Sequence, residues 1–163
     1  MATPQPRPAR TRRRCDSPEQ EAFLSLWRTY DRLRALEEEL FGRYGLTPQQ
    51  YNALRLLAAA QPGTIRTLDL AARLVSRAPD ITRLLDKLAD RGLIARDRPA
   101  DNRRVVDVAI TPAGVALLRE LREPLRQCHL KQLGHLSRRQ LDALAELLHK
   151  AREPHEHPAS SWR

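Results

Sequence analysis

The stretch that decides the fold reads "LVSRAPDITRLLDKLADRGLIARDRPADNRRVVDVAITPAG" and covers residues 74–114. Its first half carries apolar residues at helical spacing, and Gly92 then offers the left-handed backbone with which helices commonly end. Its second half alternates apolar and polar residues on either side of a charged turn. This alternation predicts two short strands, over 93–97 and 105–110. A helix over 77–91 is therefore followed directly by a β-hairpin.

Helix-start signals predict further helices on both sides of this stretch. A hydroxyl residue followed three positions later by glutamine is the capping-box pattern. It occurs at Ser17-Pro18-Glu19-Gln20, Thr47-Pro48-Gln49-Gln50 and Ser137-Arg138-Arg139-Gln140. Together with apolar stripes at helical spacing, these signals predict a helix over 17–42, one from Thr47 to Pro62-Gly63, a short one over 68–75, the helix 77–91 capped by Ser76, a long one from Thr111-Pro112, and a last one after Ser137.

The order of these elements predicts a mainly α-helical fold with a small β-hairpin wing. Two short helices, a tight turn, a third helix and a hairpin describe a winged helix-turn-helix core, in which helix 77–91 is the recognition helix. The flanking helices add apolar stripes that so small a core cannot cover, which favours a homodimer. We predict a disordered basic arm over 1–16, an N-terminal dimerisation helix over 17–46, the winged core over 47–111, C-terminal dimerisation helices over 112–152 and a frayed tail over 153–163.

The composition favours a polyanionic partner. The 163 residues carry a formal net charge of +9, and nearly all of the 29 basic residues are arginines, whose guanidinium suits phosphate and guanine. No apolar run approaches the length of a membrane span, and the N-terminus lacks the apolar region of a signal peptide. The two cysteines lie far apart and form no disulfide framework, so we expect the cytoplasm.

Nothing in the sequence indicates catalysis. We find no Gly-rich phosphate loop, no His-Glu-x-x-His, no Cys-x-x-Cys and no Gly-x-Ser-x-Gly. Cys128, His129, His135 and His149 match no compact zinc pattern, so solvent-facing histidines and a buried cysteine are the simpler interpretation. The sequence therefore predicts no enzyme, no cofactor and no metal site.

The exposed side of the recognition helix supplies predicted DNA contacts. Its N-terminal residues are placed to meet base edges in a major groove, where Arg77 or Arg83 pairs with guanine. The hydroxyls of Ser76 and Thr82 meet phosphate. Lys87 lies farther along the helix and is left out of the contact set.

The charged hairpin tip supplies the remaining contacts. An arginine there enters a minor groove, and Asp101 holds Arg103 or Arg104 in place by a charge-assisted hydrogen bond. The alternative is a solvated turn whose charges pair only with one another. The full predicted DNA-contact set is Arg66, Thr67, Ser76, Arg77, Ala78, Pro79, Asp80, Thr82, Arg83, Arg96, Arg98, Asp101, Arg103 and Arg104.

These residues resemble the MarR family of bacterial transcriptional regulators. The resemblance runs through residues 74–114, extends more loosely to 46–57 and 22–33, and is most specific at Asp90 to Ile94, Asp101 to Arg104, Thr111 and Gly114. At "DNRR", either Arg103 or Arg104 takes the place of the family's wing arginine. The resemblance implies a homodimer on pseudo-palindromic double-stranded DNA, an interface built from the terminal helices, and a small phenolic or carboxylate ligand that weakens DNA binding.

The resemblance also implies a ligand pocket where the dimerisation helices meet the DNA-binding core. The matching helices carry Trp27, Tyr30, Arg34, Tyr44 and Tyr51. Aromatic walls with an arginine suit a small aromatic carboxylate. The alternative is that these aromatic side chains are ordinary core.

A redox-sensing role is not favoured. Cys15 follows three arginines, which lower the pKa of a thiol. The redox cysteine of one family branch corresponds to a place near Phe23, however, so the resemblance does not extend to Cys15.

The leading hypothesis is a dimeric, sequence-specific transcription regulator, with repression relieved by a ligand. The alternative is a nucleoid-type or architectural protein without strong sequence preference. A regulator should prefer its site over random duplex by about 10³-fold or more, whereas an architectural protein should not. A third possibility, a winged helix that binds another protein, is disfavoured by the cluster Arg77, Arg83, Arg103 and Arg104.

Overall fold

The computed structural model describes residues 16–75, 80–98 and 105–156. The elements are α1 (Pro18–Gly42), α2 (Pro48–Ala59), β1 (Ile65–Arg66), α3 (Thr67–Arg73), α4 (Ile81–Asp90), β2 (Ile94–Asp97), β3 (Asp107–Ile110), α5 (Pro112–Leu133), α6 (Arg138–Arg152) and the 3-10 turn η1 (Glu153–His155). The chain divides into two compact units within α1, one ending at Arg34 and one running from Ala35 to the C-terminus. The mainly helical fold with a small wing is confirmed. No helix among the described residues is long and apolar enough to cross a membrane.

The capping boxes predicted at Thr47 and Ser137 are confirmed by their hydrogen bonds. The Thr47 hydroxyl accepts from the Gln50 backbone N–H at 3.2 Å, while the Gln50 side chain accepts from the Thr47 N–H at 2.8 Å. The same reciprocal pair joins Ser137 and Gln140. These bonds satisfy amides that have no partner within the helix, so each start is a local property of the sequence.

The predicted start of the recognition helix is wrong. The helix α4 begins at Ile81, because Asp80 has an extended backbone (φ −140°, ψ 80°) and its carboxylate accepts from the Arg83 N–H at 2.9 Å. Asp80 is thus the N-cap, a role that the sequence assigned to Ser76. A short acidic side chain at this position satisfies a free amide and complements the positive helix end. The predicted stop is confirmed, since Gly92 has a φ of 66°.

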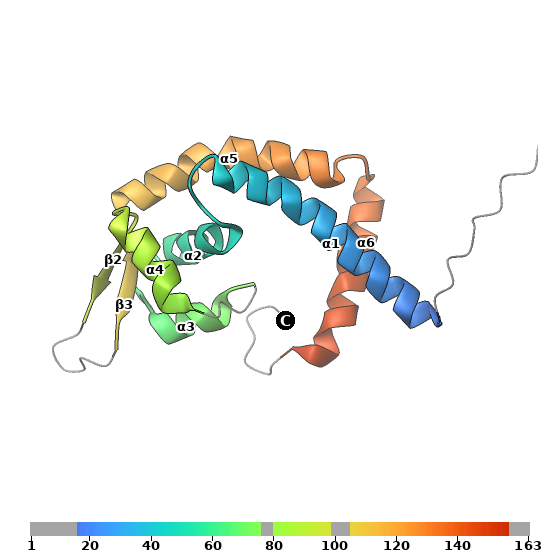
Figure 1. The fold of residues 1–163 in the computed structure, drawn as a ribbon, viewed down its shortest axis with the longest axis horizontal. Helices are drawn as coiled ribbons and strands as arrows, with labels where there is room; N and C mark the ends of the chain where they lie inside the picture. The colour runs from blue at the N-terminus through green and yellow to red at the C-terminus, as the bar shows by residue number, and fades with distance from the viewer. Residues whose placement is uncertain (1–15, 76–79, 99–104, 157–163) are drawn as a thin grey trace, which may run out of the picture. The chain divides into compact units, whose positions relative to one another are not determined.

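Three antiparallel strands form the sheet, in the order β1-β3-β2. Ile94 faces Ile110 in the β2–β3 pair, and Ile65 faces Val108 in the β1–β3 pair. The two-residue β1 was missed in the sequence, because it is too short to show a period. Figure 1 shows β2 and β3 side by side next to α4, where they form the base of the wing.

One apolar core holds the second unit together. Its fully buried members come from the end of α1 and from α2, α3, α4, β3 and α5: Phe41, Leu54, Leu57, Leu70, Leu85, Leu88, Val108 and Leu121. Leu85 and Leu88 belong to the predicted apolar side of the recognition helix, and Leu121 to the predicted stripe of α5. Because Leu85 and Leu88 are buried in the core, the opposite side of α4 faces solvent.

Thr111 and Gly114 hold the start of α5 against the sheet through hydrogen bonds and close packing. The Thr111 hydroxyl donates to the Gly92 carbonyl at 2.7 Å and accepts from the Gly114 N–H at 3.2 Å. A Cβ on Gly114 would lie 2.3 Å from the Leu93 carbonyl oxygen and 2.6 Å from Ile110 Cγ1. The neighbouring atoms belong to backbone and core, so they cannot move aside cheaply.

We therefore expect Gly114→Ala to lower the free energy of unfolding by about 1–3 kcal/mol, as overpacking does in other cores. Thermal or urea denaturation would measure it. Gly42→Ala is the matched control, because a Cβ there meets nothing within 4 Å. Equal stability of the two variants would contradict the close packing at Gly114.

Two helical segments keep large apolar side chains in solvent. In the first unit, Phe23 is 61% exposed and Trp27 is 60% exposed, on the stripe predicted from the sequence. In α6 no residue is buried, and Leu147 is 65% exposed. Such faces are typical of helices whose partner is another chain.

Candidate nucleic-acid interface

Five residues of the predicted DNA-contact set surround one hollow of about 510 Å³. They come from β1, the start of α3, α4, β2 and the residue that follows β2, so tertiary packing brings together segments about 30 residues apart. We call this the wing hollow. It is lined by Arg66, Thr67, Thr82, Arg96 and Arg98, with Leu68, Asp69, Leu85, Val105 and Val106.

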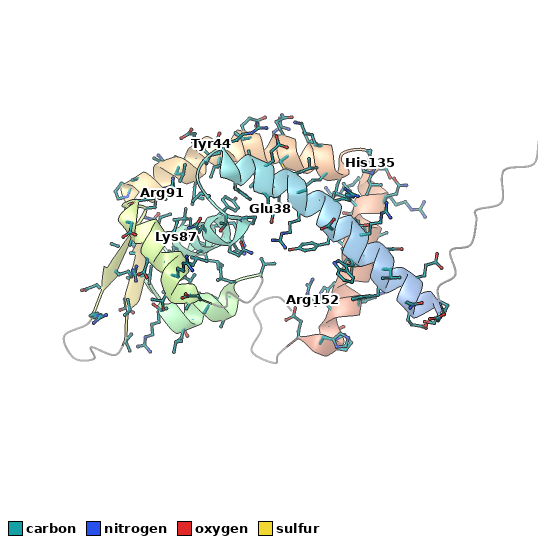
Figure 2. The ribbon with its side chains drawn as sticks, in the orientation of Figure 1. Glu38, Tyr44, Lys87, Arg91, His135 and Arg152 are labelled. Carbon is teal, nitrogen blue, oxygen red and sulfur yellow. The ribbon has the colours of Figure 1, made fainter. Side chains whose placement is uncertain are left out.

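The solvent side of α4 carries two cations one turn apart. Arg83 and Lys87 are both exposed, and their spacing of four residues places them on the same side of the helix. Lys87 is labelled on α4 in Figure 2. The Asp80 cap holds the backbone of Arg83 in the first turn, at the end of the helix that a recognition helix presents to base edges.

Thr67 ties the start of α3 to the wing. Its backbone N–H and its hydroxyl both donate to the Val106 carbonyl, at 3.0 and 3.2 Å. The hydroxyl proton is therefore already in a hydrogen bond. A phosphate contact at Thr67 requires the hydroxyl to turn away from Val106.

Arg96 pairs with a carboxylate of the recognition helix. Its Nη2 donates to Asp86 Oδ1 at 2.5 Å, with side-chain exposures of 26% and 53%. Asp86 was not among the residues singled out from the sequence. The neighbouring Arg98 is exposed, and its backbone N–H donates to the Asp97 side chain at 2.8 Å.

The sheet also places a charged row at the base of the wing. In the strand register Arg66 lies opposite Asp107, and Asp107 lies opposite Asp97. Residues directly opposite in antiparallel strands share a face, so Arg66 stands beside Asp107, and Asp97 lies one strand farther on the same face.

The rest of the predicted contact set lies outside the described residues. These residues are Ser76, Arg77, Ala78 and Pro79 before α4, and Asp101, Arg103 and Arg104 at the hairpin tip. Their DNA contacts stay predictions, as does the role of Cys15.

The end of the recognition helix is braced against the turn between α1 and α2. The Arg91 guanidinium donates to the Gly45 carbonyl at 2.7 Å and to the Tyr44 carbonyl at 3.0 Å. Arg91 and Tyr44 are both labelled in Figure 2. Gly45 has a φ of 63°, which only glycine adopts without strain, and this turn aims both carbonyls at Arg91.

A second hollow, of about 440 Å³, lies between α2 and α5. We call it the α2–α5 hollow. Both helices contribute apolar side chains and arginines to its lining. Its lining residues are Tyr51, Arg55, Ala58, Val115, Leu118, Arg119, Arg122, Leu125, Arg126 and His129.

The arginines of the α2–α5 hollow differ in their partners. Arg126 donates to both oxygens of Glu123, at 2.9 and 2.8 Å, and Gln127 Nε2 donates to one of them at 2.7 Å. These hydrogen bonds, those of Arg126 first, lower the pKa of Glu123 to about 2. Arg55, Arg119 and Arg122 form no ion pair with any carboxylate among the described residues. Three guanidinium groups are thus available to an anion.

Tyr51 contributes a neutral donor to the same hollow. Burial raises the pKa of its hydroxyl, an effect that the nearby Arg55 partly opposes. The hydroxyl therefore stays protonated at neutral pH. Its ring stacks on Phe41, with centroids 4.7 Å apart, which fixes its orientation.

The structure brings together only part of the predicted ligand set. Tyr51 lines the α2–α5 hollow, and Tyr44 packs against the same apolar core. Trp27, Tyr30 and Arg34 belong to the first unit, where Trp27 and Tyr30 are more than half exposed. Sequence reasoning missed Arg55 and the arginines of α5, although Arg119, Arg122 and Arg126 recur at helical spacing beside the apolar stripe.

Cys128 and the histidines form no metal group in the part of the chain that the structure describes. Cys128 is buried, as predicted, and burial raises the pKa of its thiol. His129 Nε2 lies 3.6 Å from Glu37 Oε1. This ion pair forms only when the imidazole is protonated.

Comparison of the sequence with known proteins finds transcription regulators. A family model described as the MarR family matches residues 46–106, the span from the α2 cap into the wing. The HTH-type transcriptional repressor YetL of Bacillus subtilis is 30% identical over 112 residues, which cover 69% of this chain and 67% of YetL.

Two solved structures share most of the chain. The crystal structure of a MarR transcription factor from Planctomyces limnophilus is 56% identical, with a TM-score of 0.68 over 83% of this chain and 98% of that one. BpsR of Bordetella bronchiseptica is 25% identical, with a TM-score of 0.72 over 80% of this chain and 98% of that one. The BpsR structure concerns regulation of DNA binding by 6-hydroxynicotinic acid.

Proposed function

The chain belongs to the MarR family of transcriptional regulators, and from this premise we propose that it is a dimeric repressor of a specific, pseudo-palindromic double-stranded DNA site. In this proposal the protein binds that site and dissociates from it when a small ligand binds. This proposal assigns no catalytic reaction to the chain and places it in the cytoplasm, with the DNA it regulates.

The observation that carries the proposal is the wing hollow beside the exposed side of α4. Three segments converge there with arginines and hydroxyls, which are the groups that bind phosphate. Arg83 stands at the start of the recognition helix, free to reach a base edge. Phosphate contacts around the hollow set the position of the protein, and α4 then reads the sequence.

Dimerisation rests on the exposed apolar faces. Residues 17–46 and 112–152 would supply the interface, as the sequence predicted. The exposed aromatic side chains of α1 and the leucines of α6 have apolar area to bury. A two-fold dimer presents two recognition helices to successive major grooves, and its site is accordingly pseudo-palindromic.

Ligand relief rests on the α2–α5 hollow. An aromatic carboxylate fits its chemistry, because the apolar lining residues suit the ring. The carboxylate would be bound by Arg55, Arg119, Arg122 and the Tyr51 hydroxyl. The likeness to BpsR supports this ligand class. We therefore place the sensing site between α2 and α5. Ligand contacts at Trp27, Tyr30, Arg34 and Tyr44 stay predictions from the sequence.

We expect Arg122→Ala to raise the aromatic carboxylate concentration needed to release DNA by about tenfold, the loss of one charge-assisted hydrogen bond. DNA affinity without ligand should not change. Titration of operator complexes with hydroxybenzoic and hydroxypyridine carboxylic acids measures both. Arg126→Ala is the matched control, since Glu123 already occupies that guanidinium. An unchanged ligand response in Arg122→Ala would exclude this site.

Selection of bound fragments from random and genomic DNA tests the regulator proposal itself. We expect one enriched motif with two-fold symmetry and a preference of about 10³-fold or more over scrambled duplex at fixed salt. Strong binding without an enriched motif would identify an architectural protein instead. Absence of any salt-sensitive DNA affinity would point to a protein-binding winged helix.

A further inference from the structure

We propose that Asp86 and Arg96 are a positioning pair that sets the wing against the recognition helix, so that Arg96 acts on DNA binding through Asp86 rather than by touching phosphate. This inference rests on the proposed function and assigns a role to Asp86, a carboxylate of α4 that pairs with a residue of β2. It also revises the predicted role of Arg96 as a direct DNA contact.

The geometry places the Arg96 side chain on the core side of the sheet. Arg96 lies opposite Val108 in the β2–β3 register, and Val108 is fully buried. Opposite residues share a face, and the guanidinium reaches α4 through its hydrogen bond to Asp86. Its side chain is only 26% exposed, whereas that of Arg138 on α6 is 88% exposed.

The Asp86–Arg96 pair connects the wing to α4 at a point remote from the turn between α4 and β2. Near the turn, the Leu93 N–H donates to the Leu88 carbonyl at 3.0 Å. Asp86 and Arg96 lie farther out on each side, ten residues apart in sequence. Thr67, the first residue of α3, makes the corresponding contact beside the other wing strand by donating twice to the carbonyl of Val106, the residue before β3. Each strand of the wing is thus tied to one helix of the helix-turn-helix.

Because Asp86 is negatively charged, the direction in which its neutralisation changes DNA affinity tests the inference. A carboxylate on the DNA-binding side repels phosphate, so by electrostatics alone its neutralisation must strengthen DNA binding and steepen the salt dependence. If Asp86 instead positions the wing through Arg96, its neutralisation must weaken binding to the operator. The two roles predict opposite changes for the same substitution.

The experiment compares full-length Asp86→Asn, Arg96→Gln and the double variant with the unsubstituted dimer, on the selected operator and on a scrambled duplex at several salt concentrations. We expect Asp86→Asn to weaken operator binding by about tenfold, with a smaller change on scrambled duplex. The double variant should be little weaker than either single variant, because both remove the same interaction. The salt slope of Arg96→Gln should equal that of the unsubstituted protein.

Asp90→Asn is the matched control. Asp90 is an exposed carboxylate on the same helix with no ion pair among the described residues, so its neutralisation should leave operator binding equal or tighter. Circular dichroism and thermal unfolding establish that each variant folds. Asp86 is 53% exposed, so its neutralisation should leave the fold intact.

Two results would overturn the inference while the regulator proposal stands. One is operator binding by Asp86→Asn that is as tight as that of the unsubstituted protein or tighter. The other is a double variant whose loss of operator affinity is the sum of the two single losses, together with a salt slope for Arg96→Gln that is lower by about one phosphate contact per subunit. Failure of the unsubstituted protein to prefer any operator would instead refute the regulator proposal, and the positioning role with it.

Discussion

Arg83→Ala is expected to lower affinity for the selected operator by about a hundredfold and to remove the preference at one base position in each half-site. Arg83 lies in the first turn of α4, where the Asp80 cap holds its backbone and its side chain is exposed. A bidentate arginine–guanine pair contributes about 1–3 kcal/mol of discrimination. A symmetric dimer uses the pair twice, so the effect on the whole operator is correspondingly larger.

The measurement is a binding isotherm for the operator and for duplexes changed at each position in turn. Lys87→Ala is the matched control, one turn farther along the same side of α4. It should weaken every duplex by the same small factor or leave binding unchanged. If Arg83→Ala weakens all sequences equally and lowers the salt slope, Arg83 contacts phosphate and does not read a base.

Trp27→Asp is expected to convert the dimer to a monomer and to lower operator affinity by about 10²-fold or more. Trp27 is 60% exposed in the first unit and stands next to Phe23 on the apolar stripe, with ring centroids 6.0 Å apart. A charge in the middle of an apolar interface cannot be buried without a partner. Each recognition helix then binds its half-site alone, without the gain from linking the two.

Sedimentation gives the oligomeric state, and the same samples give operator affinity. Ser25→Asp is the matched control, since it adds the same charge to α1 on the side away from the stripe. It should stay dimeric and bind normally. A dimeric Trp27→Asp variant would exclude this face from the interface, and a monomeric unsubstituted protein would refute the dimer.

Local chemistry made most elements of the fold predictable. The Thr47 and Ser137 capping boxes and the Gly92 stop act within one helical turn, so neighbouring residues suffice to identify them. The alternation of Val106, Val108 and Ile110 likewise predicts a half-buried strand from its period alone. The helix-turn-helix followed by a wing could be derived from these signals.

Elements without a period, or with competing signals, could not be derived. The strand β1 has two residues and exists only because the edge of β3 offers it hydrogen-bond partners. At the start of α4, Ser76 and Asp80 are both good caps, and local propensity does not rank them. The structure shows that the helix begins at Ile81 and that the Asp80 carboxylate is its cap.

In the candidate site, too, some features could be predicted from the sequence and others depend on tertiary packing. The sequence by itself determined which residues carry charge, which helix exposes them and which stripe they oppose, because helical and strand periods are local. Only the tertiary structure decided which arginines are occupied: Arg96 by Asp86, Arg91 by the carbonyls of Tyr44 and Gly45, Arg126 by Glu123. It also joined Arg55 to Arg119 and Arg122 in one hollow. The physical reason is that the strength of a guanidinium's interaction depends on distance and solvent exposure, and packing between elements sets both.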